Sequence, residues 1–383
     1  MKWKKIPIKD ICIGIYDGPH ATPKTSESGP VFLGIQNFNN GRLDFSEIRH
    51  ISEEDFSKWT KRVEPRANDI VFSYEATLNL YAIIPENLRC CLGRRLALIR
   101  IDETKAHYKF VYYYFQSNSW KAEIKKNTVL GATVDRIPLI KFPDFLIELP
   151  PLELQYKIAD YLSEYDSLIE NNKKQIKLLE EAAQRLYKEW FVKLHFPGWK
   201  NTQSIKENSI KWKEGKLQDI AEFKRGKIIT KADVKCGSVP VIAGGINPAY
   251  YHDEANTKAP VVTISASGAN AGYTSLYPVD IFASDCLYID SESTDYVYYV
   301  YCFLKHSSKQ IENLQKGSAQ PHVYAKDING LKLIIPNNKY LDLFTDIVST
   351  YFKQIQILQR KCILLSEARY RLLPKLMSGE IEV

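Results

Sequence analysis

The segments KFVYYYFQSN (residues 109–118) and DYVYYVYCFL (residues 295–304) are two versions of one tyrosine-rich phrase, and they decide how the rest of the sequence is divided. Placing Phe110 on Tyr296 gives an offset of 186 residues that needs no gap through the rest of the first half. Near the amino terminus, WKKIPIKDI recurs as WKEGKLQDI at an offset of 209 residues. The sequence is therefore a tandem duplication, and a repeat of this length predicts two domains rather than a solenoid.

Length and composition are those of a folded chain of two domains. It has 383 residues, of which 45% are hydrophobic and 25% charged. No apolar run approaches the roughly 20 residues that span a bilayer, the amino terminus has no apolar segment of signal-peptide length, and seven cysteines without a C-x-x-C pair predict reduced thiols. These features predict a cytoplasmic protein. A net charge of +7 and a pI near 8.8 permit nucleic-acid binding, but a solvated lysine-rich surface explains them equally well.

Each half ends in a heptad pattern typical of a coiled-coil helix. Apolar residues recur at alternating spacings of four and three, which is a 3.5-residue repeat. The positions in the first half are Ile158, Leu162, Tyr165, Ile169, Asn172, Ile176, Leu179, Ala183, Leu186 and Trp190. At the offset of 186 they become Phe344, Val348, Tyr351, Ile355, Leu358, Cys362, Leu365, Arg369, Leu372 and Leu376. Because each helix has a narrow apolar seam, the two helices are expected to pair with each other, antiparallel and related by a pseudo-two-fold axis.

The two helices have three further features with structural consequences. Pro374 should end or kink the second helix near Leu373. Asn172 either fixes the register of the seam or rotates into water. Additional apolar residues lie off the seam and are expected to dock partner subunits, although packing against the chain's own domains is the alternative. These residues are Leu168, Leu178, Ala182, Ile357 and Leu364.

Ahead of each helix lie short apolar runs separated by turn residues, which are typical of mixed α/β domains. The predicted fold is α+β, with two tandem mixed α/β domains separated by a pair of long antiparallel coiled-coil helices and related by pseudo-two-fold symmetry. The tyrosine-rich segments are expected to begin helices, although their composition also suits strands. The predicted boundaries are a first domain at 1–149, a helix at 150–196, a linker at 197–211, a second domain at 212–335, and a second helix with a carboxyl-terminal tail at 336–383.

Four segments resemble a known family. They are ELPPLELQYKIADYL (residues 148–162), LYKEWFVKLHFPG (186–198), GSAQPHVYAKDINGLKLIIP (317–336) and ARYRLLPKLMSGEIEV (368–383). Over essentially its whole length the chain resembles the specificity subunit of type I restriction-modification enzymes. It departs from that family at IIPNNKYLDLF (334–344), where the second helix lacks the proline pair and the glutamine of LPPLELQ.

The resemblance implies a DNA-binding subunit without catalytic activity. In such proteins two target-recognition domains each bind one half of an asymmetric, interrupted DNA sequence, and the paired helices hold the domains apart. The implied partners are double-stranded DNA, two modification subunits that use S-adenosylmethionine to methylate adenine at N6, and restriction subunits that use ATP and Mg²⁺ as motor and nuclease. The resemblance implies no cofactor on this chain itself and no membrane partner.

Loops that combine basic, amide and aromatic residues are the candidate DNA contacts, because Arg, Asn and Gln pair with base edges and Lys mostly binds phosphate. In the first domain they are His20, Lys24, Gln36, Asn37, Asn39, Tyr74, Asn79, Lys126, Thr128 and Arg136. In the second domain they are Lys224, Arg225, Lys227, Asn247, Tyr250, Asn270, Lys316, Gln320 and His322. Any single one is also explained as an ordinary surface-loop residue. As a set they gain weight because Gly131 and Gly317 mark loops at matched positions.

Two other functions were weighed against DNA recognition. A self-sufficient DNA methyltransferase fragment is suggested by NPAY (residues 247–250), which is close to the N-P-P-[YF] box that holds a flipped adenine. Its third position is Ala249, and no glycine-rich loop suited to S-adenosylmethionine accompanies it, so a turn is the better interpretation. The other alternative is a coiled-coil assembly protein without DNA specificity. The sequence contains no zinc-ligand cluster, no phosphate-binding loop and no complete metal-nuclease pattern.

Overall fold

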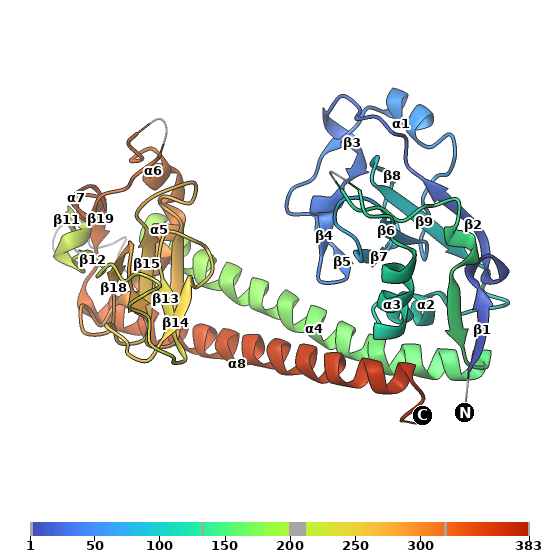
Figure 1. Cartoon of the computed structure of the whole chain (residues 1–383). Helices are drawn as coiled ribbons and strands as arrows, with labels where there is room; N and C mark the ends of the chain where they lie inside the picture. The colour runs from blue at the N-terminus through green and yellow to red at the C-terminus, as the bar shows by residue number, and fades with distance from the viewer. Residues whose placement is uncertain (1–2, 132–133, 199–211, 318–319, 382–383) are drawn as a thin grey trace. The chain divides into compact units, whose positions relative to one another are not determined.

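The computed structural model describes residues 3–131, 134–198, 212–317 and 320–381 of the chain (Figure 1). Most of the linker predicted at residues 197–211 lies outside these described residues. The chain divides into two compact units, Met1–Glu170 with Ile363–Val383, and Asn171–Cys362. The division passes through both long helices, α4 (Leu152–Tyr187) and α8 (Asn338–Met377), so each unit contains one mixed domain and part of each helix.

The domain of the first unit is built on a four-stranded antiparallel sheet. Its strand order is β2 (Cys12–Asp17), β9 (Leu96–Ile101), β6 (Ile70–Ser73) and β7 (Tyr81–Ile83). In addition, β3 (Ser26–Leu33) runs parallel to β8 (Cys90–Leu92), β1 (Lys4–Pro7) pairs antiparallel with β10 (Leu146–Leu149), and β4 (Phe38–Asn39) pairs with β5 (Arg42–Leu43). The strands β6 and β9 are apolar on both faces because both faces are buried.

The domain of the second unit repeats this arrangement. Its four-stranded antiparallel sheet has the order β12 (Lys224–Arg225), β18 (Cys286–Ile289), β15 (Val261–Ser265) and β16 (Thr274–Tyr277). The strand β13 (Val239–Ile242) runs parallel to β17 (Phe282–Ala283) and antiparallel to β14 (Tyr250–His252), and β11 (Lys213–Lys216) pairs antiparallel with β19 (Lys332–Ile335). Strand order and direction therefore match those of the first unit.

The pairing registers reproduce the two sequence offsets. Lys4 of β1 lies opposite Leu149 of β10, and Lys213 of β11 lies opposite Ile335 of β19. Lys213 is the counterpart of Lys4 at an offset of 209, and Ile335 is the counterpart of Leu149 at an offset of 186. The duplication predicted from the sequence is confirmed in the backbone.

The tyrosine-rich segments form helices, α2 (Tyr108–Tyr114) and α5 (Val297–His306), which confirms the helical interpretation. The β-prone composition is overridden because these residues fill the cores, where Tyr113 and Tyr299 are almost fully buried. The other α-helices are α1 (Glu53–Trp59), α3 (Asn118–Asn127), α6 (Ser308–Glu312) and α7 (Ala325–Asn329), and a π-helical turn at Lys188–Val192 follows α4.

The predicted seam residues of α4 and α8 are all buried or half-buried. In the first unit the start of α4 shares a core with the end of α8, including Leu162 and Leu376. In the second unit the end of α4 shares a core with the start of α8, where the Trp190 and Phe344 rings lie 6.1 Å apart. The helices therefore pair in antiparallel fashion, as predicted. Asn172 is only 8% exposed, so the interpretation that it rotates into water is wrong.

Pro374 does not end the second helix. The helix continues to Met377, and Pro374 lies inside its last turn, so the predicted end near Leu373 is wrong. Leu376 and Met377 are buried in the core of the first unit. Burial of these two side chains holds the last turn in place despite the hydrogen bond that a proline removes.

Truncation of the seam should destabilise the second unit. Phe344→Ala removes a fully buried ring that contacts Tyr187, Trp190 and Phe191, and we expect the free energy of unfolding to fall by about 3–5 kcal/mol. Ile357→Ala on the same helix is the control, because that side chain is half exposed and its loss should change the value by about 0.5 kcal/mol or less. Urea unfolding followed by circular dichroism measures both, and equal losses would contradict the assigned seam.

Candidate nucleic-acid interface

In the first unit, three strand ends and one loop meet at one edge of the main sheet. Asp17 ends β2, Glu75 follows β6, and Arg95 precedes β9. Arg136, on the loop that follows α3, forms a β-bridge with Glu75, and the Arg95 Nε lies 3.9 Å from Glu75 Oε1. Two acidic and two basic side chains thus gather where the chain turns between strands, which is where binding residues are commonly placed on a rigid scaffold.

In the second unit, the same positions carry Arg225, Ser267, Asp285 and His322. Arg225 Nη2 donates a hydrogen bond to Asp285 Oδ1 at 2.7 Å, and Ser267 Oγ donates to Asp285 Oδ2 at 2.8 Å. His322 forms a β-bridge with Ser267, as Arg136 does with Glu75 in the first unit. Arg136 and His322 are also related by the offset of 186 residues. Strand register and sequence offset therefore define four equivalent positions.

The chemistry at these equivalent positions is different. The end of the first strand is an acid in one unit, Asp17, and a base in the other, Arg225. The residue before the central strand is Arg95 in one unit and Asp285 in the other. Donors and acceptors are thus exchanged on the same backbone frame. The side chains at these two sheet edges therefore cannot form hydrogen bonds with the same sequence of base pairs.

At each edge, the residue after the first strand of the sheet lies very close to the backbone of the neighbouring strand. Gly18 N donates to the Leu96 carbonyl oxygen at 3.0 Å, and Gly226 N donates to the Cys286 carbonyl oxygen at 2.8 Å. A Cβ atom on Gly18 would stand 2.5 Å from the Gly93 carbonyl oxygen, and one on Gly226 would meet backbone at 2.3 Å. Both turns therefore require glycine, since the obstructing atoms are backbone.

A small basic pocket of about 190 Å³ adjoins the edge in the first unit, and its lining includes Arg49, Arg94, Arg95 and Gln36. Arg49 lies over the Phe32 ring at 5.0 Å, and with the Gln36 amide turned to face it, Arg49 Nη2 donates to Gln36 Oε1 at 2.6 Å. The Arg95 Nε is buried and has no hydrogen-bond partner among the described residues. Such a pocket suits an anion or the edge of a guanine, which guanidinium groups bind with paired hydrogen bonds.

Several predicted contact residues have structural roles instead. Asn37 is buried and caps the turn from Gly34 with its side-chain oxygen, and Thr128 donates to the Ile124 carbonyl oxygen at the end of α3. Tyr74 is buried, which raises its pKa to about 12, so its hydroxyl is protonated at neutral pH and donates to the Arg94 carbonyl oxygen at 2.7 Å. Tyr74 therefore positions the loop of Arg94 rather than presenting its own side chain.

The structure brings some predicted residues to the two edges and leaves others in scattered surface positions. Gln36, Arg136, Arg225 and His322 lie at the edges, and His20 is there through its contact with Asp17 at 3.1 Å. Asn270 and Gln320 lie on turns that meet beside Ser267, because Gly268 N donates to the Pro321 carbonyl oxygen. Two residues are held by acidic neighbours, Asn39 by Asp44 and Lys316 by Asp327. The remaining predicted residues are exposed or half-buried on other loops, on strands or, for Lys126, at the end of α3: Lys24, Asn79, Lys126, Lys224, Lys227, Asn247 and Tyr250. Ser318 and Ala319 of the GSAQPH segment lie outside the described residues.

Several residues that are absent from the predicted set of DNA contacts are brought to the two sheet edges by the strand register. Arg94 and Arg95 form a basic pair directly before the apolar run of β9, which is a signal that could have been used. Arg49, Ser267 and Asp285 have no comparable signal, because only the folded sheet places them beside the others.

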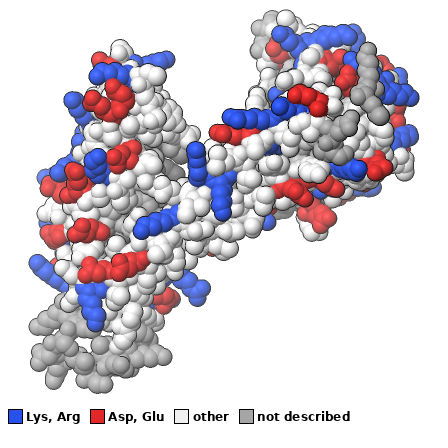
Figure 2. All heavy atoms as spheres, turned by 90° about the horizontal axis from the view of Figure 1, so that it is seen from below, with Lys and Arg blue, Asp and Glu red and all other residues white. Residues whose placement is uncertain are grey.

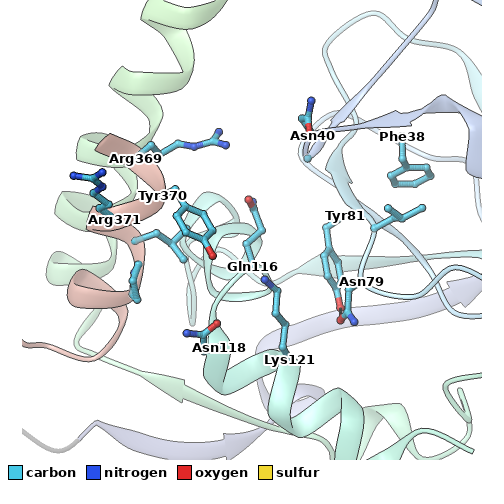
Figure 3. Close-up of a pocket in the computed structure, with 14 residues that line it drawn as sticks. Phe38, Asn40, Asn79, Tyr81, Gln116, Asn118, Lys121, Arg369, Tyr370 and Arg371 are labelled. Carbon is cyan, nitrogen blue, oxygen red and sulfur yellow. Dashed lines mark hydrogen bonds between the residues drawn. The ribbon is translucent and has the colours of Figure 1, made fainter. Parts of the chain in front are cut away.

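A second cavity of about 490 Å³ lies in the first unit beside α8 (Figure 3). In Figure 3, Gln116 points into it from the turn before α3, Lys121 from α3 and Tyr370 from α8. Asn79 also lines it, and Asn79 belongs to the same β6–β7 turn as Glu75.

Charge alone does not locate the interface. On the face shown in Figure 2, Lys and Arg side chains are interspersed with Asp and Glu side chains on both units. Within the described residues there is no group of three or more His, Cys, Asp or Glu that could hold a metal ion, and no helix among them is long and apolar enough to cross a membrane. The equivalent strand ends, rather than overall charge, define the site.

Comparison with known proteins agrees with this geometry. The sequence model of the type I restriction modification DNA specificity domain matches residues 1–181 and 209–365, one match in each half of the duplication. The chain belongs to this family.

Individual relatives point the same way. The chain is 27% identical over 362 residues to the type I restriction enzyme MjaIX specificity subunit of Methanocaldococcus jannaschii, covering 88% of this chain and 82% of that protein. It is 23% identical to the putative MjaX specificity subunit of the same organism, covering 100% and 94%. The crystal structure of the S subunit of a type I restriction-modification system from M. genitalium has the same fold, with a TM-score of 0.62 at 20% identity over 98% of this chain and 96% of that one. The resemblance seen in the sequence and the predicted fold class are confirmed.

Removal of a side chain at the sheet edge of one domain should affect DNA recognition by that domain only. In the assembled enzyme, we expect Arg136→Ala to weaken selectivity at one part of the methylated sequence and His322→Ala at another, each by about 1–3 kcal/mol per lost base contact. Long-read sequencing of methylated adenines in DNA from cells with the assembled enzyme measures the change. Lys58→Ala, on exposed α1, is the control and should leave the sequence unchanged. Identical changes from both variants would contradict the assignment of one edge to each part of the target.

Proposed function

We propose that this specificity subunit binds an asymmetric, bipartite DNA target, with one half-site bound by each domain. The observation that supports this is the exchange of side chains at equivalent positions, Asp17 against Arg225 and Arg95 against Asp285, on two copies of one sheet. The two sheets have the same backbone and can lie on DNA in the same way. Their strand ends carry different hydrogen-bond donors and acceptors, which select different bases.

Two domains in one chain solve a problem of affinity and selectivity. One domain meets only a few base pairs, and each base pair contributes about 1–3 kcal/mol of discrimination. Once one domain is bound, the covalent connection raises the effective concentration of the other at its own half-site. The pair therefore discriminates by the sum of both half-sites without requiring tight binding from either alone.

Within the first domain, the small basic pocket lined by Arg49, Arg94, Arg95 and Gln36 is the proposed site of base recognition. Arg49 and Gln36 face each other, and Arg95, whose Nε has no hydrogen-bond partner among the described residues, lines the same pocket. Guanidinium and carboxamide groups are the side chains that make paired contacts to guanine and adenine in the major groove. Exposed lysines of this domain, such as Lys24 on a loop and Lys126 at the end of α3, then bind backbone phosphates without selecting a sequence.

The subunit is proposed to be non-catalytic. In the NPAY segment, Tyr250 lies in β14 opposite Val241, and Ala249 N donates to the Val241 carbonyl oxygen. A strand-bound tyrosine of this kind does not form the loop that stacks on a flipped base. Adenine-N6 methylation is therefore assigned to partner modification subunits that hold S-adenosylmethionine, and cleavage to restriction subunits that use ATP and Mg²⁺.

Exposed apolar residues on the long helices are the proposed docking sites for two modification subunits. Leu178 is 63% exposed and Leu364 is 47% exposed, and these two residues are counterparts at the offset of 186. Leu168 and Ile357 are also half exposed, whereas Ala182 is half-buried. One residue of the matched pair lies in each unit, so two copies of the same partner can bind in equivalent ways.

Catalysis by the isolated chain tests the assignment of roles. The purified subunit is expected to transfer no methyl group from tritiated S-adenosylmethionine to DNA, and addition of the modification subunits should give methylation. Methyl transfer by the chain alone would support the methyltransferase alternative instead. Methylation by the assembled complex without any sequence preference would support the alternative of an assembly protein.

The matched leucines allow a count of docked partners. Leu178→Asp and Leu364→Asp should each reduce the number of modification subunits per chain from two to one, because a charge now enters an apolar contact, and the double variant should bind none. Native mass spectrometry of the complex gives the count. Lys177→Asp on the neighbouring exposed position of α4 is the control and should keep both partners. Full binding by the double variant would place the docking site elsewhere.

A further inference from the structure

Asp166 of α4 is the centre of a polar cluster in the seam of the first unit. Its carboxylate accepts hydrogen bonds from the Tyr113 hydroxyl of α2, at 2.6 Å, and from the Arg369 guanidinium of α8. Its backbone carbonyl oxygen accepts from Arg42 of β5 at 2.7 Å, and Arg42 also forms an ion pair with Glu170 at 3.2 Å. Asp166 is 9% exposed, so four elements of the unit meet at one largely buried acid.

The matched place in the second unit is apolar. The offset of 186 residues carries Asp166 to Phe352 and relates Arg369 to Ala183. The Phe352 ring stacks on Tyr298 with the centroids 5.1 Å apart and the planes at 5°. Ala183 is fully buried in the same core. The two seams are therefore alike in most of their apolar pattern and differ in charge at this pair of positions, as they differ in polarity at Asn172, whose counterpart is Leu358.

This difference separates correct helix partners from incorrect ones. Because the helices are duplicates, α4 could also pair antiparallel with the α4 of a second copy, and α8 with a second α8. The first arrangement would place Asp166 opposite Ala183, and the second would place Arg369 opposite Phe352. Each would set a largely buried charge against an apolar side chain and remove its partner on the facing helix, which is unfavourable even though Arg42 Nη2 also lies 3.5 Å from Asp166 Oδ1. Only α4 with α8 brings the opposite charges together.

We propose that the Asp166–Arg369 pair determines the partner of α4, selecting a helix that carries the opposite charge at the position of Arg369. The apolar seam stabilises any of these helix pairings. The polar pair decides which helices pair, as a single polar seam residue does in coiled coils. When α4 pairs with α8 of the same chain, the helix pair carries one copy of each domain. Pairing of two α4 helices or two α8 helices from different chains would instead join two identical domains. This inference concerns assembly of the chain and does not depend on the proposed DNA target.

Charge exchange between two full-length chains tests the proposal. One chain carries Asp166→Arg, the other carries Arg369→Asp, and the two are co-expressed with different affinity tags. Within either chain like charges now meet, whereas α4 of one chain and α8 of the other bring opposite charges together in both seams. Capture of one tag should recover about tenfold more of the other tag than capture from two tagged wild-type chains, a ratio equivalent to about 1.4 kcal/mol.

Two controls make the result specific. Asp160→Arg with Arg371→Asp makes the same charge changes at exposed positions of the same helices and should give no increase. A single chain with both Asp166→Arg and Arg369→Asp should return to the wild-type level, because its own helices again carry opposite charges. The proposal is overturned if the mixed chains show no increase, if they yield no soluble protein together, or if the exposed control pair gives an equal increase.

Discussion

Burial of the seam between α4 and α8 is the constraint on which the rest of the structure depends. Neither helix can leave its apolar stripe in water, and each continues from one compact unit into the other. As a result, neither unit is built from one continuous stretch of sequence. The core of the first unit includes Leu376 and Met377 from the far end of the chain, and the core of the second includes Ala183 and Tyr187 from α4.

The duplicated domains show which parts of the fold are fixed by packing and which are free to vary. Strand order, strand direction and the register of β1 with β10 and of β11 with β19 are the same in both. Gly18 and Gly226 are also equivalent, because any side chain there would collide with backbone. By contrast, Asp17 and Arg225 lie at the strand ends, where their side chains are 22% and 50% exposed. Their chemistry can be exchanged without cost to the frame, which makes the strand ends suitable for selecting different sequences.

The sequence predicted the helices and the duplication well because periodicity reports directly on which face is buried. Every seam position it identified is buried or half-buried, including Asn172 and Arg369. The DNA contacts stay a prediction, and residue type does not reveal whether a polar side chain in a loop faces solvent or satisfies the backbone. Asn37, Tyr74 and Thr128 serve the backbone. Arg49 and Asp285 were missed because only the pairing of distant strands brings them to the site, and Pro374 was misjudged because tertiary packing outweighed a local preference.

The two copies of the helix also divide into positions that are alike and positions that are not, and burial alone does not explain the division. Leu178 and Leu364 are alike and exposed, although an exposed leucine contributes little to folding. An apolar residue at both places suits the proposed docking of two copies of one partner. Asp166 and Phe352 are unlike and buried, where a symmetric choice would have sufficed for packing. A chain that presents equal surfaces outward and unequal contacts inward can bind two copies of one partner and still hold two different domains in a fixed order.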